Sequence, residues 1–172
     1  MNWPLRDQTD PVPSNDVRAE GGTYALILFC SRQERVQIGK LGPLQLRRGF
    51  YLYVGSAVGP GGVRARLAHH RKVSQPPHWY IDFLRPHTHL DRVWYSHDPV
   101  RREHQWARVI HALRGASVPV AGFGSSDCHC KTHLFFFTRR PSFNEFRQRV
   151  GAPLVGARDL CFSGNRKDVL RF

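Results

Sequence analysis

The chain has 172 residues and a formal net charge of +13, from 26 Lys and Arg against 13 Asp and Glu. This length predicts one domain of ordinary size, and an aromatic content of 12% excludes a wholly disordered chain. No apolar run approaches the roughly 18 residues of a membrane-spanning helix, and no hydrophobic stretch follows the first charges as in a secretory signal. The four cysteines are too few for a disulfide framework, so we expect a cytoplasmic protein.

The excess of positive charge points to a polyanionic partner, because it would otherwise cost self-repulsion in a small domain. Nucleic acid is the first candidate, and an acidic protein or a membrane surface is the alternative. Arg outnumbers Lys by 22 to 4, which favours forked hydrogen bonds to phosphate over diffuse solvation. Arg-rich codon usage in a GC-rich genome would give the same composition without such a partner.

The first half of the chain predicts strands. Residues 1–20 contain three prolines and show no hydrophobic period, which indicates an irregular arm. Apolar and aromatic runs then predict three adjacent strands, joined as an antiparallel meander, at 23–29, 36–38 and 50–54. A glycine-rich turn at 55–62 opens into a helix at 63–71. The turn lacks the lysine of a nucleotide-binding loop, so we interpret it as a flexible connection.

The second half mixes helices and strands. In chain order, its pattern predicts a short helix at 78–84, a strand at 93–96, a helix at 101–114, a glycine- and serine-rich loop at 122–126, a strand at 134–137 and a short basic helix at 139–149. The fold class is therefore α/β, with a small, mainly antiparallel β-sheet flanked by helices. We expect an arm at 1–20, a domain at 21–149 and a tail at 150–172.

The helix at 63–71 carries candidate ligands for an anion. Arg66 and His70 are four residues apart and stack on one face, beside the apolar stripe. An arginine at a buried edge is costly unless an anion pairs with it. A solvated basic helix is the alternative. Three further basic side chains of this segment could contact a nucleic acid: Arg64, Arg71 and Lys72.

The helix at 101–114 contains one acid among several arginines. Its apolar stripe includes Trp106 and Ile110, and Glu103 lies at the margin of that stripe. A carboxylate at a buried edge is a suitable ligand for Mg²⁺, which binds through one or two carboxylates and several waters. An ion pair within the helix is the alternative.

Four potential metal ligands lie close together in the sequence: Cys128, His129, Cys130 and His133. Cys and His are the preferred ligands of Zn²⁺, but structural zinc sites usually combine two distant pairs, with wider spacing inside the cysteine pair. Here a single residue separates the cysteines. The pattern leaves a zinc site open and favours local structural cysteines.

Two short motifs, Gly22-Thr23-Tyr24 and Tyr53-Val54-Gly55, lie on two of the predicted strands. They resemble the paired motifs of the GIY-YIG nuclease superfamily. Arg66 and His70 then look like the Arg and His of that family's first helix, and Glu103 looks like its metal-binding glutamate. The family order of these motifs is kept along the chain.

A closer resemblance covers residues 21–138. The Gly-Pro-Gly-Gly turn, the segment from His78 to Asp82 and the run from 122 to 133 look like a little-characterised GIY-YIG subfamily, some of whose members are fused to endonuclease III. This resemblance implies a role in DNA repair or processing. His78 also resembles a histidine of homing endonucleases. Many members carry an Asn after the glutamate helix, and its place would be taken here by Ser125, Ser126 or Asp127.

The resemblance implies a metal-dependent endonuclease that acts on nucleic acid, DNA more than RNA, with Mg²⁺ or Mn²⁺ held by Glu103. Arg66 would offset charge in the transition state. Tyr24 would be the general base or would orient the water, and as a base it would need a nearby cation to lower its pKa from about 10. Tyr53 and His70 would position the water or relay its proton. We expect these five side chains to converge on one concave, positively charged surface.

Two alternatives belong to other functional classes. The first is a non-catalytic nucleic-acid-binding module of the same fold, which the missing Asn favours. The second is a zinc-dependent hydrolase centred on Cys128, Cys130 and His133.

Overall fold

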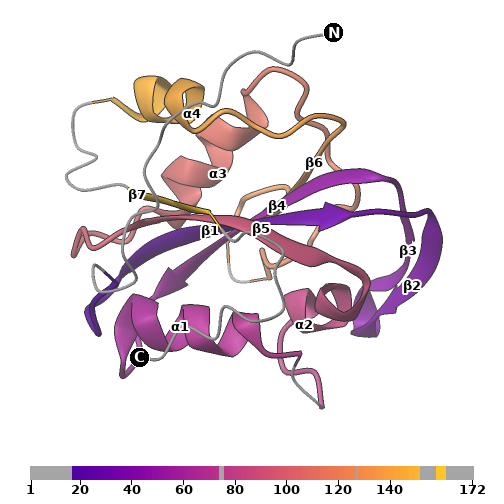
Figure 1. Ribbon diagram of the computed structural model, residues 1–172, viewed down its shortest axis with the longest axis horizontal. Coiled ribbons are helices and arrows are strands. Elements are labelled where there is room, and N and C mark those ends of the chain that lie inside the picture. Colours follow the sequence, from indigo (N-terminus) through magenta and orange to yellow (C-terminus); the bar gives the residue numbers. More distant parts are fainter. Residues whose placement is uncertain (1–16, 74–75, 127, 152–157, 162–172) are drawn as a thin grey trace, which may run out of the picture.

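The structure is a computed structural model, and it describes residues 17–73, 76–126, 128–151 and 158–161. It shows an α/β fold in which helices flank an antiparallel sheet (Figure 1), as expected. No helix within the described ranges has both the length and the apolar character needed to cross a membrane. Asp127, one of the predicted site residues, lies outside the described residues.

The predicted elements occur in the expected order. The described strands are β1 (Gly22–Cys30), β2 (Glu34–Ile38), β3 (Gly42–Leu46), β4 (Gly49–Ala57), β5 (His89–Ser96), β6 (Leu134–Phe137) and β7 (Arg158–Cys161), of which β3 and β7 are two additional strands. The α-helices are α1 (Gly62–Arg71), α2 (Tyr80–Leu84), α3 (Glu103–His111) and α4 (Phe143–Val150), with short 3₁₀ helices at Gly39–Leu41 and Arg85–His87. α4 begins later than expected because the Ser142 side chain caps it, accepting a hydrogen bond from the amide of Glu145.

A five-stranded sheet runs through the middle of the molecule in the order β6–β4–β1–β5–β7, with antiparallel pairing throughout. β1 pairs along its whole length with β4, so the strands expected at 23–29 and 50–54 are neighbours. The strand expected at 36–38 does not join them, because β2 pairs with β3 in a separate two-stranded sheet. The predicted meander was wrong here. Each strand of that hairpin buries alternate residues, which lets one apolar face pack on the core: Val36, Ile38, Leu44 and Leu46.

Alternate residues of the central strands fill two cores, one on each face of the large sheet. On the first face, Tyr24 and Leu26 of β1 pack in one cluster with buried residues of α1 and α2. On the second face, Ala25 and Ile27 pack in one cluster with buried residues of α3 and α4. Figure 1 shows α1 and α2 below the sheet and α3 and α4 above it. Because both faces of β1 are buried, the strand reads as a continuous apolar run.

The segments on either side of the predicted domain also contribute to it. Val17 is buried in the first core, and the Val63 amide donates to the Glu20 carbonyl at 2.8 Å. The last residues of the expected arm therefore belong to the folded domain. Within the expected tail, β7 pairs with β5 and extends the sheet. Residues 1–16, 152–157 and 162–172 of these two segments lie outside the described residues.

Candidate active site

A cavity of about 640 Å³ opens beside β4 and contains most of the predicted site residues. The predicted residues that line it are Tyr24, Tyr53, Arg66, His78, Glu103 and Ser126. His70 differs, because it is 1% exposed and lies behind Tyr24 instead of on the cavity surface. The structure thus brings together side chains from both paired motifs, from the first helix and from the glutamate helix.

The cavity lies where β4 extends past the end of β6. The two strands pair only from Phe50 to Tyr53, and the next amide, that of Val54, donates to the His133 carbonyl at 2.9 Å. The start of α3 reaches this place from the second face of the sheet, since the Arg102 amide donates to Thr23 Oγ1 at 3.1 Å. Residues of α1 and α2 line the cavity from the first face, so it collects side chains from both layers.

Two glycines of the paired motifs are required because other atoms of the sheet approach their Cα atoms too closely for a side chain. Tyr24 on β1 lies directly opposite Gly55 on β4. A Cβ on Gly55 would lie 2.6 Å from Tyr24 Oη and 2.7 Å from Tyr24 Cζ, far inside van der Waals contact. A Cβ on Gly22 would lie 2.0 Å from the carbonyl oxygen of Ser96 on β5. These glycines let the Tyr24 side chain cross β4 into the cavity and let β1 approach β5.

Tyr24 and His70 form a buried hydrogen-bonded pair, with 2.8 Å between Tyr24 Oη and His70 Nε2. Burial raises the pKa of Tyr24 well above its usual value, and the neighbouring Tyr53 raises it further. The charge of Arg66 lowers that pKa but does not compensate for burial. The expectation that a cation lowers the pKa of Tyr24 below its usual value is therefore wrong for this arrangement of residues.

His70 is held neutral by its surroundings. Burial, with a contribution from His69, lowers the pKa of His70 to about 3. Its Nδ1 is buried and has no hydrogen-bond partner among the described residues. The imidazole is thus an uncharged group whose Nε2 faces the hydroxyl of Tyr24.

Arg66 is held at the cavity by Trp79, which lies just before α2. The guanidinium carbon lies 4.3 Å from the centroid of the indole ring, a cation–π contact. The Trp79 backbone is fixed in turn, since its amide donates to Asp82 Oδ2 at 2.9 Å. Burial would raise the pKa of Asp82, but hydrogen bonds from the amides of Trp79 and His78 and from the His69 side chain lower it overall. Asp82 is therefore a charged anchor for this wall of the cavity.

Glu103 is the only acidic residue among the described residues that line the cavity. It is 4% exposed, begins α3 and forms an ion pair with Arg101, which also lines the cavity. The ion pair that the sequence offered as an alternative is therefore present. A single carboxylate beside open space also fits Mg²⁺, which takes few protein oxygens and keeps several waters. Both interpretations of Glu103 remain compatible with its geometry.

The other predicted residues lie further out. His78 and Ser126 are exposed where they line the cavity. On and just after α1, Arg64 and Lys72 are exposed and Arg71 is half-buried. These three basic residues do not line the cavity, so they could contact only parts of a ligand that extend beyond it.

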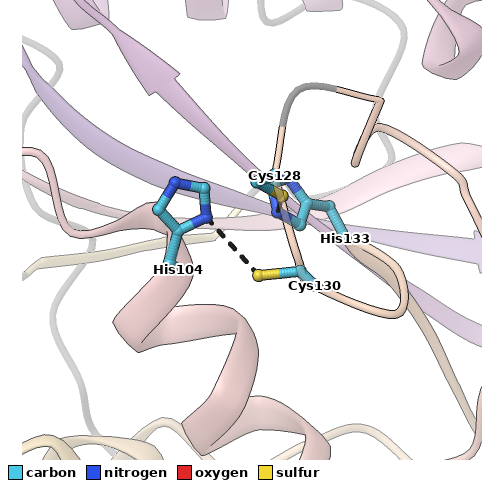
Figure 2. Close-up of side chains that lie close together, drawn as sticks. All are labelled: His104, Cys128, Cys130 and His133. Carbon is cyan, nitrogen blue, oxygen red and sulfur yellow. Dashed lines mark hydrogen bonds between the residues drawn. The ribbon is translucent and has the colours of Figure 1, made fainter.

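A second group of potential ligands lies beside the first turn of α3. It consists of His104, Cys128, Cys130 and His133, whose ligand atoms all lie within 4.8 Å of one another (Figure 2). Three of these residues were predicted from the sequence. The fourth predicted residue was His129, but in the structure the fourth member of the group is His104. His129 is exposed and does not belong to the group. Burial, together with the neighbouring Cys128, raises the pKa of the Cys130 thiol to about 11.

Sequence reasoning thus missed three residues of this region: Trp79, Arg101 and His104. Trp79 follows His78 and Arg101 lies two positions before Glu103, so these predicted neighbours were the available signal. His104 has no such signal for a role with the cysteines, because it precedes Cys128 by 24 positions and joins it only through the fold.

The comparisons with known proteins identify a family. The family model described as a domain of unknown function, DUF123, matches residues 23–154, which is most of the chain. Neither the search of curated proteins nor the search of solved structures found a match. The matched segment spans the elements from β1 to α4 and therefore includes the cavity. The chain belongs to the DUF123 family.

Proposed function

We propose that this protein is a divalent-metal-dependent endonuclease that hydrolyses phosphodiester bonds in nucleic acid, DNA more readily than RNA. One observation carries the proposal: the buried Tyr24–His70 hydrogen bond ends at a cavity with a single described carboxylate, that of Glu103. A hydroxyl backed by a neutral base can accept a proton from water, and a carboxylate beside it can hold the metal ion that such hydrolysis uses.

The Tyr24–His70 pair supports general-base chemistry without a tyrosinate. Because the pKa of Tyr24 is raised, its hydroxyl keeps its proton at neutral pH. Neutral His70 can take that proton at Nε2 while Tyr24 Oη takes one from the attacking water, but only transiently, because a pKa of about 3 makes the protonated imidazole a strong acid. The water then attacks phosphorus as hydroxide, and the positive charge passes to a buried imidazole. Charge development at that buried site favours return of the proton once the leaving oxygen departs.

Arg66 supports stabilisation of the transition state. Negative charge grows on the phosphate oxygens during in-line attack, and a fixed guanidinium offsets it most where water is scarce. The cation–π contact with Trp79 limits the motion of Arg66, so less side-chain entropy is lost when phosphate binds. Arg101 adds a second cation to the same cavity.

Glu103 is the residue that would hold Mg²⁺ or Mn²⁺ on the cavity wall. When bound, the ion supplies Lewis-acid stabilisation of a phosphate oxygen. The formal charge of +13 supports a polyanionic substrate, and the exposed Arg64 and Lys72 could contact phosphates outside the cavity. A role in DNA repair or processing and a cytoplasmic location belong to the same proposal.

One observation favours the second candidate, a nucleic-acid-binding module that does not cut. The ion pair between Arg101 and Glu103 engages the carboxylate that a metal ion would need. If that pair persists when nucleic acid is bound, the cavity would present only cations and hydroxyls to phosphate. Binding would then be retained without hydrolysis.

A cleavage assay distinguishes the two candidates. The protein is incubated with single-stranded, duplex and flap substrates of DNA and RNA, with Mg²⁺, Mn²⁺ or EDTA. We expect metal-dependent cleavage that Glu103→Gln abolishes while affinity measured in EDTA changes little, because the amide keeps the shape but is a poor Mg²⁺ ligand. Glu145→Gln is the matched control, since Glu145 lies in the first turn of α4, on another helix.

The outcomes separate the candidates cleanly. Cleavage by the wild type and by Glu145→Gln, but not by Glu103→Gln, supports the endonuclease. Binding without cleavage under every metal condition supports the binding module. Unchanged cleavage by Glu103→Gln would move the metal ligand to another carboxylate and contradict the site proposed for it.

A further inference from the structure

We propose that His104, Cys128, Cys130 and His133 form a structural Zn²⁺ site that fastens the loop from 122 to 133 to the start of α3. The four residues supply two sulfur and two nitrogen ligands, a set that is typical of tetrahedral zinc. Four protein ligands fill such a tetrahedron, which leaves no position for a catalytic water. The site therefore differs from the zinc-dependent hydrolase that three ligands would allow.

The distances fit zinc closely. Cys128 Sγ lies 3.4 Å from His133 Nε2, and Cys130 Sγ lies 3.4 Å from His104 Nδ1. Zinc–sulfur bonds of about 2.3 Å and zinc–nitrogen bonds of about 2.0 Å give tetrahedral ligand separations of about 3.3–3.8 Å. The remaining pairs are all within 4.8 Å, so small side-chain movements complete the coordination. Figure 2 shows His104 reaching from α3 toward Cys130, with Cys128 and His133 beside them.

The orientation of His104 is that of a zinc ligand with an outer partner. Its Nδ1 faces Cys130 Sγ, and its Nε2 lies 3.5 Å from Glu103 Oε1. Metal-bound histidines commonly donate their second ring N–H to a carboxylate, which fixes the tautomer and makes the imidazole a better ligand. The Glu103 carboxylate is within ion-pair distance of that nitrogen, and a small movement would make it such a partner, shared between the zinc site and the cavity.

The loop that carries three of the ligands is already shaped by its own backbone. The Gly122 amide donates to the Lys131 carbonyl at 2.8 Å, and the His133 amide donates to the Phe123 carbonyl at 2.8 Å. Phe123 is fully buried in the first core, which anchors the base of the loop. A shaped loop loses less conformational entropy when it binds a metal. The hydrogen bonds hold the base of the loop, and the zinc ion would hold Cys128 and Cys130 against α3.

Both cysteines of the group are free thiols, so their sulfurs are available to a metal ion. Zinc binding would convert both thiols to thiolates and release two protons to solvent, so that the ion and its ligands are neutral together. A cavity of about 860 Å³, lined by His104 and by both cysteines, gives an ion access to the group.

The test is metal binding by the full chain in the absence of nucleic acid. We expect purified, reduced protein to contain one zinc per chain by elemental analysis. Replacement by Co²⁺ should give thiolate-to-cobalt charge-transfer absorption and the intense visible bands of a tetrahedral ion. The decisive pair is His104→Ala against His129→Ala. His104→Ala should lose stoichiometric zinc, and His129→Ala should keep it, although only His129 lies between the two cysteines.

Two results would overturn the site. One is a reduced wild-type protein that binds neither Zn²⁺ nor Co²⁺ stoichiometrically, as two purely structural thiols would predict. The other is zinc retention by His104→Ala with loss in His129→Ala. If His104→Ala does not fold, X-ray absorption of the wild-type zinc protein tests the site. We expect two sulfurs at about 2.3 Å and two nitrogens at about 2.0 Å from the zinc ion. A zinc coordination shell without sulfur contradicts the site.

This measurement is separate from the proposed nuclease activity. A protein that binds zinc through these four residues but cuts no nucleic acid would support the zinc site and contradict the endonuclease. Cleavage by a protein that binds no zinc would support the endonuclease and contradict the zinc site.

Discussion

The burial of neutral His70 makes a prediction about stability that needs no substrate. Its pKa is lowered to about 3 in the folded protein, against a reference value of about 6.5 for an exposed histidine. Below pH 6.5 the unfolded chain binds a proton at His70, whereas the folded protein leaves His70 unprotonated until the pH approaches 3. The free energy of unfolding should therefore fall as the pH drops from 6.5 toward 3, and it should be insensitive to His70 above that range.

The size of the effect follows from the two pKa values. At pH 5 the unfolded histidine is almost fully protonated and the folded one is not, which costs about 2 kcal/mol of stability relative to pH 8. The slope approaches about 1.4 kcal/mol per pH unit in the steep part of the curve. In the folded protein, burial and the neighbouring His69 lower the pKa of His70, and the charge of Asp82 raises it. Arg85 and Arg66 lower it further.

Urea unfolding of the wild type and of His70→Gln, measured from pH 8 to pH 5, tests this reasoning. The amide can still bond to Tyr24 but does not titrate, so the variant should lack about 2 kcal/mol of the pH-dependent loss. Exposed His89 on β5 provides the control, because His89→Gln should keep the wild-type dependence. Parallel curves for the wild type and His70→Gln would refute the claim that His70 is buried in its neutral form.

Further substitutions test the close approach of strands and the separation of binding from rate. Gly55→Ala should lower the free energy of unfolding by about 1–3 kcal/mol, because its Cβ would lie 2.6 Å from Tyr24 Oη. Gly59→Ala is the control, because no atom of another segment lies within 4 Å of its Cβ. Equal urea midpoints for the two variants would contradict the clash. Arg64→Ala should weaken binding to all sequences alike and reduce the slope of log affinity against log salt concentration by about 0.9 on duplex DNA. Arg147→Ala on α4, across the sheet, should change neither. A wild-type affinity that does not depend on salt would remove the electrostatic case for nucleic acid. Arg66→Ala should reduce the single-turnover cleavage rate far more than affinity, and a loss confined to affinity would make Arg66 only a binding residue.

Most of the sheet could be predicted from the sequence because its strands are strongly apolar. The runs at 23–29, 50–54 and 134–137 all form strands of one sheet, since such segments are stable only when both faces are covered. The strand β3 was missed because Gly42 and Pro43 at its start are typical of a turn. β7 was missed because its four residues show no period against the polar segment around them.

The candidate site was predicted by two routes, the local spacing of Arg66 and His70 and the resemblance of the paired motifs and Glu103 to a known family. Arg66 and His70 are four residues apart on one helix, so periodicity alone brings them to one side. The same reasoning does not show how deeply a side chain is buried. His70 is enclosed beneath Tyr24, and burial raises the pKa of Tyr24, against the expected direction, and lowers the pKa of His70. A sequence indicates which residue types could act together. The solvent exposure that decides their protonation comes from the packed layers.

The start of α3 explains how one short segment can serve two sites. Successive residues of an α-helix point about 100° apart, so neighbours in sequence face different surroundings. Glu103 lines the cavity beside β4, whereas His104 lines the cavity that contains both cysteines. Because His104 Nε2 also lies 3.5 Å from the Glu103 carboxylate, a cation held by His104 would bias the position of the carboxylate that faces the cavity. The same turn would then couple the stability of the 122–133 loop to the electrostatics of the proposed active site.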